Sequence, residues 1–336
     1  MLSLYLTYPD WIDPYVINGL PVRWYALMYL VAFFVTYLLV RYQCRHDGVI
    51  EMDADETQSL FFSCCLGLLI FARIFSVLFY SDGLYYITHP WMIFWPFRDG
   101  QFVGLPGMSY HGGVVGCVLG GWLFSRRHHR SLLQMTDLTT AAIPLGYTFG
   151  RLGNFINGEL FGRVTTKPWG MVFPLAERFS TYEPWVRKVA DEVGMEYELG
   201  QLVNLPRHPS QLYEALFEGI VLFLILWLVI RPMKNRRGLP HGTVFSFYLM
   251  GYGIFRFFIE YCRQPDASIG YVISLGKKGN GSIALFESFL NISEGQVFCL
   301  LMIAAGAVLL SVLMARRHYD NGKAGKSERH PQRKRH

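Results

Sequence analysis

Residues 136–163 read TDLTTAAIPLGYTFGRLGNFINGELFGR, and this stretch passes from an apolar run into a dense polar cluster. The cluster, residues 150–163, holds two arginines, two asparagines, a glutamate and four glycines. An ionisable group in or near hydrocarbon costs about 2.5–3.5 kcal/mol on insertion scales, and such groups usually mark function. We therefore interpret residues 150–163 as part of a binding or reaction site at the end of a membrane-spanning segment.

The composition of the chain is typical of a protein that crosses a membrane several times. Of its 336 residues, 52% are hydrophobic and only 17% are charged, which places it outside the usual range of soluble domains. Apolar runs of about 20 residues can span the hydrocarbon core. They occur near residues 20–40, 58–80, 108–125, 136–156, 211–231, 243–262 and 296–315. Because lipid offers backbone groups no hydrogen-bond partner, the sequence predicts an all-α membrane protein, a bundle of seven transmembrane helices.

Basic residues predict how this bundle is oriented, because short cytoplasmic loops carry an excess of Lys and Arg. The connections after the first, third and fifth runs are basic, and so is the tail after the seventh. Their residues are Arg41, Arg45, Arg126, Arg127, Arg130, Arg231, Lys234, Arg236 and Arg237, with Gln-Arg-Lys-Arg-His at the C-terminus. Placing all four segments on one side predicts an N-terminus outside and a C-terminus in the cytoplasm.

The polar segments outside the apolar runs predict the remaining organisation. Residues 157–208 are long enough for a small cap on the outer side, and the aromatic residues of 81–107 are typical of a segment at the membrane interface. We assign residues 1–320, cap included, to one transmembrane domain. Residues 321–336 are expected to form a basic, disordered cytoplasmic tail. The net charge of +6 indicates topology and attraction to membrane lipids rather than binding to nucleic acid.

Arg151 and Asn154 are the members of the polar cluster that best suit an anion. They stand three residues apart and would share a helical face, and Gly153 and Gly158 would allow close backbone approach or a break in the helix. A guanidinium group matches phosphate oxygens in a bidentate fork. The alternative is that Arg151 and Glu159 only anchor the helix end at the interface.

The sixth apolar run carries a second constellation, in which Tyr252, Arg256 and Glu260 recur at intervals of four residues and so line one face. Arg256 lies well inside the apolar stretch. It could form a purely structural intramembrane pair with Glu260. Alternatively, Arg256 and Tyr252 face a lipid phosphate, while Glu260 orients the arginine.

Two further motifs open apolar runs from the outer side. Ser-Tyr-His-Gly-Gly at 109–113 contains His111, whose near-neutral reference pKa suits a general base, although a histidine that only forms hydrogen bonds at the interface is the alternative. Arg-His-Pro-Ser-Gln-Leu-Tyr-Glu at 207–214 reads as a helix start, after which Glu214 and Glu218 share one face.

The chemistry that these residues favour is recognition of an anionic lipid headgroup, because bundles turn such groups toward an interior cavity. The sequence contains no phosphate-binding Gly-Lys-Ser/Thr loop, His-Glu-x-x-His, Gly-x-Ser-x-Gly or Asp-rich metal box. Its six cysteines follow no disulfide or metal-binding spacing. We therefore expect neither a metal nor another cofactor.

The motifs together resemble the prolipoprotein diacylglyceryl transferase family of the bacterial inner membrane. The fourteen positions Gly150–Arg163 look like the family signature. Other matching motifs are Arg-Trp-Tyr at 23–25, His-Gly-Gly at 111–113, residues 207–214, Tyr-Gly-x-Phe-Arg-Phe-x-x-Glu at 252–260 and Arg-Gln-Pro-Asp at 263–266. The resemblance spans nearly the whole chain, but the outer loop that contains Gly-Lys-Lys-Gly-Asn-Gly at 276–281 is longer than expected of the family.

The resemblance implies transfer of a diacylglyceryl group from phosphatidylglycerol to the lipobox cysteine thiol of a prolipoprotein signal peptide, with release of glycerol phosphate. The cap would then be periplasmic, and the active site would face the periplasmic leaflet. Arg151 and Arg256 would hold the headgroup and His111 would assist thiol deprotonation. The residues that would shape the site are Tyr25, Asn154, Asn157, Glu159, Gly162, Tyr252 and Glu260.

Two other classes of protein remain as alternatives. A lipid or anion transporter would also place arginines on broken helices near a central cavity, but transporters usually carry an internal repeat and we find none. A non-catalytic membrane scaffold would need only apolar faces and would not concentrate polar groups inside. The transferase is therefore the favoured hypothesis.

Overall fold

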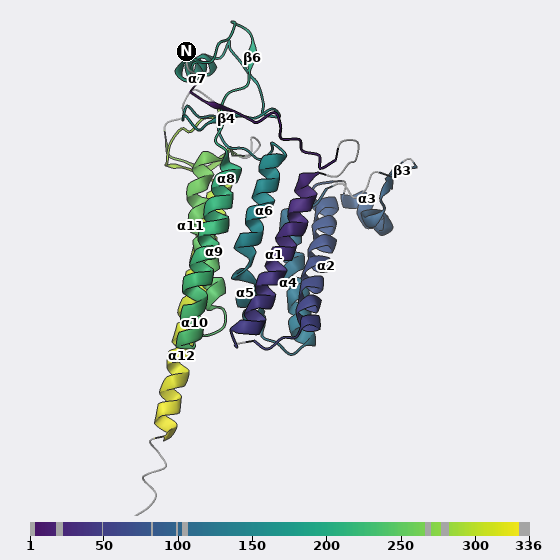
Figure 1. Cartoon of the computed structure of the whole chain (residues 1–336), viewed down its shortest axis with the longest axis vertical. Helices are drawn as coiled ribbons and strands as arrows, with labels where there is room; N and C mark the ends of the chain where they lie inside the picture. Colours follow the sequence, from purple (N-terminus) through teal and green to yellow (C-terminus); the bar gives the residue numbers. More distant parts are fainter. Residues whose placement is uncertain are drawn as a thin grey trace, which may run out of the picture. The chain divides into compact units, whose positions relative to one another are not determined.

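The computed structural model describes residues 4–17, 23–48, 50–81, 83–98, 100–102, 107–265, 270–276 and 282–328. These residues are mostly helical, which confirms the predicted all-α class. The chain divides into two compact units, one formed by Met1–Thr36 with Thr139–His336 and the other by Tyr37–Leu138. Figure 1 shows the elements of each unit in sequence colours.

Each of the seven apolar runs is helical over most of its described length, and residues 20–22 of the first run lie outside the described residues. The helices are α1 (Trp24–His46), α2 (Ala54–Phe79), α4 (Tyr110–Arg127), α5 (Leu132–Thr140) with α6 (Ile143–Ile156), the segment Ser210–Arg237, α11 (Thr243–Ile259) and α12 (Glu294–Glu328). In the described part of the chain, four are long and apolar enough to cross a membrane: Trp24–His46, Ala54–Phe79, Ser210–Arg237 and Glu294–Asn321. The protein is therefore a multi-pass membrane protein, and seven crossings remain a prediction.

The fourth run differs from the single helix expected over residues 136–156. It is divided between α5 and α6, with a break after Thr140. Pro144 lies in the first turn of α6, the position where its missing N–H costs no helical hydrogen bond. The α6 helix is consequently only 14 residues long, and it carries Arg151 and Asn154 near its end.

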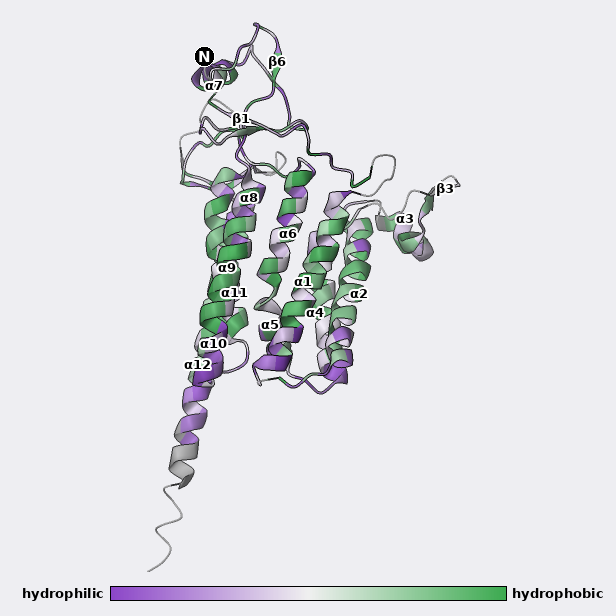
Figure 2. Cartoon of the chain, viewed as in Figure 1, coloured by the Kyte–Doolittle hydropathy of each residue, from purple (hydrophilic) through white to green (hydrophobic). Residues whose placement is uncertain are grey.

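The segment Ser210–Arg237 alternates between two helical forms. The α-helical pieces are α8 (Ser210–Glu214), α9 (Leu222–Leu224) and α10 (Arg231–Arg237), and the π-helical pieces are η2 (Ala215–Val221) and η3 (Ile225–Ile230). Stretches of π-helix are rare and often mark functional sites. Figure 2 shows hydrophobic colour along α9 and α11 and hydrophilic colour at α10, where the basic residues gather.

The second unit is built on a close contact between α2 and α4. A Cβ atom placed on Gly116 would lie only 2.0 Å from the carbonyl oxygen of Gly67, so the two backbones meet at this point. Small residues allow this kind of approach between membrane helices. The connection between α2 and α4 holds α3 (Gly83–Thr88), the 3₁₀ helix η1 (Pro90–Phe94) and the hairpin of β2 (Phe97–Arg98) with β3 (Gln101–Phe102).

The predicted cap is present as short strands and one helix at the end of the first unit where α8 begins (Figure 1). Its elements are β4 (Met171–Val172), β5 (Phe179–Ser180), α7 (Pro184–Val193) and β6 (Leu202–Val203), together with the N-terminal strand β1 (Leu6–Thr7), which pairs in parallel with β4. Its core is apolar and includes Val164, Val186 and Leu205. Backbone bridges join Arg207 to both Val164 and Met171. The cap is thereby fastened to the chain that enters α8.

The outer loop before the last helix forms a short hairpin of β7 (Tyr271–Ser274) and β8 (Asn291–Ser293). Residues 266–269 and 277–281, which include most of the glycine-rich sequence of this loop, lie outside the described residues. The α12 helix continues to Glu328, past the predicted domain boundary at 320. Residues 329–336 of the expected tail are not described.

Candidate functional site

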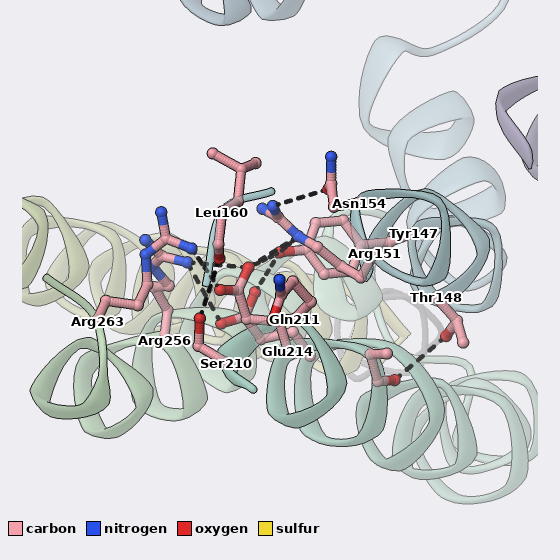
Figure 3. A network of polar contacts seen from close by, with 12 residues as sticks. Tyr147, Thr148, Arg151, Asn154, Leu160, Ser210, Gln211, Glu214, Arg256 and Arg263 are labelled. Carbon is pink, nitrogen blue, oxygen red and sulfur yellow. Dashed lines mark hydrogen bonds and ion pairs between the residues drawn. The ribbon is translucent and has the colours of Figure 1, made fainter. Parts of the chain in front are cut away.

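The polar cluster at residues 150–163 is joined directly to the start of α8. Ser210 donates its hydroxyl to the carbonyl oxygen of Leu160 (3.1 Å), and Gln211 donates its amide to the carbonyl oxygen of Glu159 (2.6 Å). Both side chains are fully buried, so water has little access to these two hydrogen bonds. These two hydrogen bonds place Glu214, one turn further along α8, beside α6 (Figure 3).

Glu214 is the centre of the site, because three arginines from three segments converge on its carboxylate. Its Oε2 lies 2.8 Å from Nε of Arg151 and 3.2 Å from Nη1 of Arg256, and its Oε1 lies 2.6 Å from Nη1 of Arg263. The Glu214 side chain is fully buried. A buried carboxylate needs such compensation, since an unpaired charge in a low-dielectric interior is strongly destabilising.

Arg151 is held on both sides by neighbouring side chains. Its Nε lies 2.6 Å from the Tyr147 hydroxyl, its Nη1 donates to the amide oxygen of Asn154 (3.4 Å), and its guanidinium lies 4.7 Å from the centre of the Tyr147 ring. Asn154 and Asn157 in turn donate their amide groups to Glu159. The Arg151 side chain nevertheless keeps 19% of its surface exposed. Arg151 is therefore fixed by its neighbours and still partly accessible.

Arg256 makes the predicted pair with Glu260, at 2.8 Å between Nη2 and Oε2. Glu260 is itself oriented by Ser293, whose hydroxyl donates to Oε1 at 3.2 Å. The pairing with Glu214 shows that Arg256 belongs to the larger cluster and not only to an isolated pair on α11. The side chain of Arg256 is 17% exposed, so it is also partly accessible.

This arrangement suits the recognition of a phosphate group. Guanidinium donors that buried carboxylates already orient need little reorganisation when an anion arrives. In the described residues, no group of three or more His, Cys, Asp or Glu side chains is placed to hold a metal ion. The groups that the cluster offers to an anion are arginine guanidinium groups, held in place by carboxylates and amides.

Comparison with known proteins decides the family. A sequence profile described as "Prolipoprotein diacylglyceryl transferase" matches residues 14–312. The chain belongs to this family. Two relatives are each named phosphatidylglycerol–prolipoprotein diacylglyceryl transferase. The one from Treponema pallidum is 49% identical to this chain, and the match covers 91% of this chain and 94% of the relative. The one from Treponema denticola is also 49% identical, and the match covers 93% of this chain and 95% of the relative. The relative from Coxiella burnetii is 40% identical and covers 80% and 87%.

In this member of the prolipoprotein diacylglyceryl transferase family, the structure brings together most of the residues singled out from the sequence. Arg151, Asn154, Asn157 and Glu159 form one hydrogen-bonded chain, and Glu214 connects it to Arg256 and thereby to Glu260. Tyr252 lies near Tyr147, with ring centres 6.0 Å apart. The roles of these residues in the reaction remain predictions.

Tyr25, His111 and Gly162 are the predicted site residues that lie outside this network of contacts. Gly162 packs against the backbone of His208 and Cys262. Tyr25 donates its hydroxyl to Tyr29 (3.0 Å), and its backbone lies next to Gly153, where a Cβ atom would come within 3.4 Å of the Tyr25 Cα. His111 lies in the first turn of α4, in the other unit, with an exposed side chain. The part of His111 in catalysis therefore stays a prediction.

Four residues that the structure places in the cluster were not among the predicted site residues: Tyr147, Glu214, Glu218 and Arg263. Two of them could have been recognised as site residues from the sequence, because Glu214 and Glu218 are carboxylates spaced by four residues at the start of an apolar run. Such residues inside a membrane segment indicate buried partners. Only the motif at 263–266 marked Arg263, and nothing local marks Tyr147, since their places in the cluster depend on how segments distant in sequence pack.

Arg163, the last residue of the polar stretch 150–163, has surroundings that differ from those of Arg151. It is nearly fully buried, at 2% exposure. Its Nε donates to the carbonyl oxygen of Arg263 (2.6 Å) and its Nη1 to that of Leu285 (3.0 Å), and Nη1 also contacts the Tyr271 hydroxyl. Arg163 thus ties the outer loop to the cap, through carbonyl oxygens and not through carboxylates.

We expect Gly162→Ala to be severely damaging, because there is no space for a methyl group. A Cβ atom at this position would lie 2.1 Å from the carbonyl oxygen of Cys262 and 3.0 Å from Cβ of His208. Overpacking of this kind costs about 1–3 kcal/mol, and the backbone pairing of residues 162 and 263 would also shift. Thermal unfolding of purified protein should show a lower melting temperature. Gly150→Ala, where no atom lies within 4 Å, is the matched control; equal melting temperatures for the two variants would contradict this account.

His208, which contacts Gly162, should make the folded protein less stable in mild acid. Burial, helped by the charges of Lys167 and Arg163, lowers the pKa of His208 to about 4. In the unfolded chain its pKa is about 6.5, so between these values the unfolded chain binds a proton that the folded protein does not. Stability should therefore fall as the pH is lowered through this window. Melting temperatures at about pH 7 and about pH 5 should differ more for the wild-type protein than for His208→Gln; an equal difference would show that another group is responsible.

Proposed function

We propose that this protein transfers the diacylglyceryl group of phosphatidylglycerol to the lipobox cysteine thiol of a prolipoprotein, the first step of bacterial lipoprotein maturation. The reaction forms a thioether and releases glycerol phosphate. The observation that carries the proposal is the cluster in which Arg151 and Arg256 share the buried carboxylate of Glu214 while each side chain stays partly exposed. The names of the relatives from Treponema and Coxiella agree with this activity.

The proposed chemistry uses the cluster to stabilise the leaving group. The cysteine thiolate is the nucleophile; it attacks the glyceryl carbon that is bonded to a phosphate oxygen. The carbon–sulfur bond forms, the carbon–oxygen bond breaks, and the electron pair remains on the phosphate. Arg151 and Arg256 would stabilise this growing negative charge as preorganised donors. His111 would accept the thiol proton.

The surrounding residues would shape the lipid site. Asn154, Asn157 and Glu159 would hold Arg151 in position, and Glu260 would hold Arg256. The hydrogen bonds and ion pairs of these residues support this role. Tyr25 and Tyr252 would contact the substrate, and Gly162 would permit the close packing below the site. No metal or other cofactor is needed for these steps.

The proposed location is the inner membrane, with the active site in the periplasmic leaflet. Seven spans with the N-terminus outside would place the basic end of α10 in the cytoplasm. Within the first unit, the cap and the α10 helix lie at opposite ends of the segment Ser210–Arg237 (Figure 1), and Glu214 is near the cap end. This polarity supports a site close to the outer surface. Residues 1–320 would form the transferase domain and residues 321–336 the cytoplasmic tail.

One assay tests the proposed reaction. Purified protein is incubated with phosphatidylglycerol and a peptide that contains a lipobox cysteine, and the peptide is examined by mass spectrometry. We expect a product heavier by one diacylglyceryl group, and none from the Cys→Ser peptide. If no thioether forms while phosphatidylglycerol moves between the leaflets of a vesicle, the protein is a lipid transporter and the proposal is wrong.

A further inference from the structure

Glu218 is a buried carboxylic group in the cluster whose charge is poorly compensated. It lies four residues after Glu214, on the same face of the helical segment, and is only 1% exposed. Its Oε2 accepts a hydrogen bond from the Tyr147 hydroxyl at 2.5 Å. Its Oε1 is buried and has no hydrogen-bond partner among the described residues. One half of this carboxyl group is therefore left without a donor.

The three arginines of the cluster lie closer to the other two carboxylates. Glu214 has guanidinium nitrogens at 2.6, 2.8 and 3.2 Å, and Glu260 has them at 2.8 and 3.8 Å. For Glu218 the nearest is Nη1 of Arg256, at 4.0 Å. The Tyr147 hydroxyl has one proton and lies between Glu218 and Glu214, which is 3.3 Å away. It cannot donate fully to both carboxylates.

The remaining charged and titratable neighbours do not compensate the charge of Glu218 either. Arg151 lies on α6 and is held by Glu214. Tyr252 lies with Arg256 on α11, and Glu260 directly follows the end of that helix. Arg263 pairs with Glu214. Cys299 on α12 also lies within range of an electrostatic interaction with Glu218. An ionised carboxylate buried without full compensation is strongly disfavoured, and such a group takes up a proton instead.

We propose that Glu218 is a protonated, neutral carboxylic acid at neutral pH, and that it leaves the three arginines with one positive charge in excess over the two carboxylates that pair with them. An ionised Glu218 would make three carboxylates for three arginines and cancel that excess. Glu159 approaches the cluster only through the amides of Asn154 and Asn157 and forms no ion pair in the described structure. The excess charge matches a phosphodiester, which carries one negative charge; this consequence rests on the proposed lipid substrate, whereas the protonation itself does not.

Infrared spectroscopy tests the protonation directly. The wild-type protein in nanodiscs at neutral pH should show the C=O band of a protonated carboxyl group, and Glu218→Gln should lose it. Glu192→Gln, which changes an exposed glutamate of the cap, should keep it. Absence of the band from the wild type, or its survival in Glu218→Gln, overturns the proposal. If Glu218→Gln is not recovered folded, wild-type protein with ¹³C-labelled glutamate replaces it, and a band that does not shift with the label overturns the proposal equally.

Lipid binding then tests the excess charge. The affinity for phosphatidylglycerol vesicles, relative to phosphatidylcholine vesicles, is measured as the pH is raised until the carboxyl band disappears. Loss of one net positive charge should weaken the preference at least about tenfold in the wild type, and the preference of Glu218→Gln should not change with pH. An unchanged preference in the wild type overturns the electrostatic role. A carboxyl band without any preference for phosphatidylglycerol overturns the proposed function and the role of the charge, while the protonation stands.

Discussion

Glu214→Gln should reduce the transferase activity at least about hundredfold, because three arginines lose the carboxylate that they share. The substitution keeps the size of the side chain and removes its charge. Breaking a buried ion pair from one side costs about 3–5 kcal/mol, and each 1.4 kcal/mol corresponds to about a factor of ten in rate. Arg151, Arg256 and Arg263 would repel one another and leave the positions that Glu214 gives them. The activity is measured as thioether product on the lipobox peptide.

A matched control separates this effect from a general loss of charge. Glu192→Gln makes the same chemical change on the exposed surface of α7 and should retain wild-type kinetics. Both variants are compared as folded protein after gel filtration, with kcat and KM determined separately. Because Glu214 acts through the arginines, we expect kcat to fall as well as the affinity for phosphatidylglycerol. Wild-type kcat in folded Glu214→Gln would remove this residue from the mechanism.

Arg151→Ala and Arg256→Ala should each abolish detectable product while the protein still inserts into the membrane. Removing one preorganised donor from an anionic transition state usually lowers kcat by about 10²–10³-fold. Here each variant also leaves part of the charge of Glu214 uncompensated. The measurement is the rate of thioether formation at saturating phosphatidylglycerol.

Two further variants sharpen the test of the arginines. Arg151→Lys and Arg256→Lys keep the positive charge but lose the planar fork, so they should restore binding of the lipid more than catalysis. Arg178→Ala, on the exposed surface of the cap, is the control and should be as active as the wild type. Wild-type rates in either alanine variant would exclude that arginine from the reaction.

Much of the fold could be predicted from the sequence because its signals are local. Hydrophobic runs are continuous along the chain and lipid forces each into a helix, so the helical class and the approximate position of each run could be predicted from the hydrophobic pattern of the sequence. The break between α5 and α6 was not predicted, although Pro144 is a residue type that commonly begins a helix. The cap was also predicted, since residues 157–208 are polar and long, but its strands pair segments as distant as Leu6 and Met171.

The candidate site was only partly predictable. The residues 150–163 and the face of Arg256 stand out because ionisable groups in apolar sequence are rare, and the resemblance to a family added His111. The sequence did not indicate that Arg151 and Arg256 share a single carboxylate, or that Arg263 joins them. It also left the role of Arg163 open, which the structure explains by hydrogen bonds to Arg263 and Leu285 across the outer loop.

The sequence by itself determined that this protein is helical and membrane-bound and that its polar residues gather near residues 150–163, because hydrophobicity and charge are properties of each segment. The tertiary structure decided which charges are paired. Glu214 is compensated three times and Glu218 hardly at all, although they stand four residues apart on one helix face. The difference arises because compensation depends on distances between α6, α8 and α11 of a few ångströms, which are set by packing and hydrogen bonds and not by the local sequence.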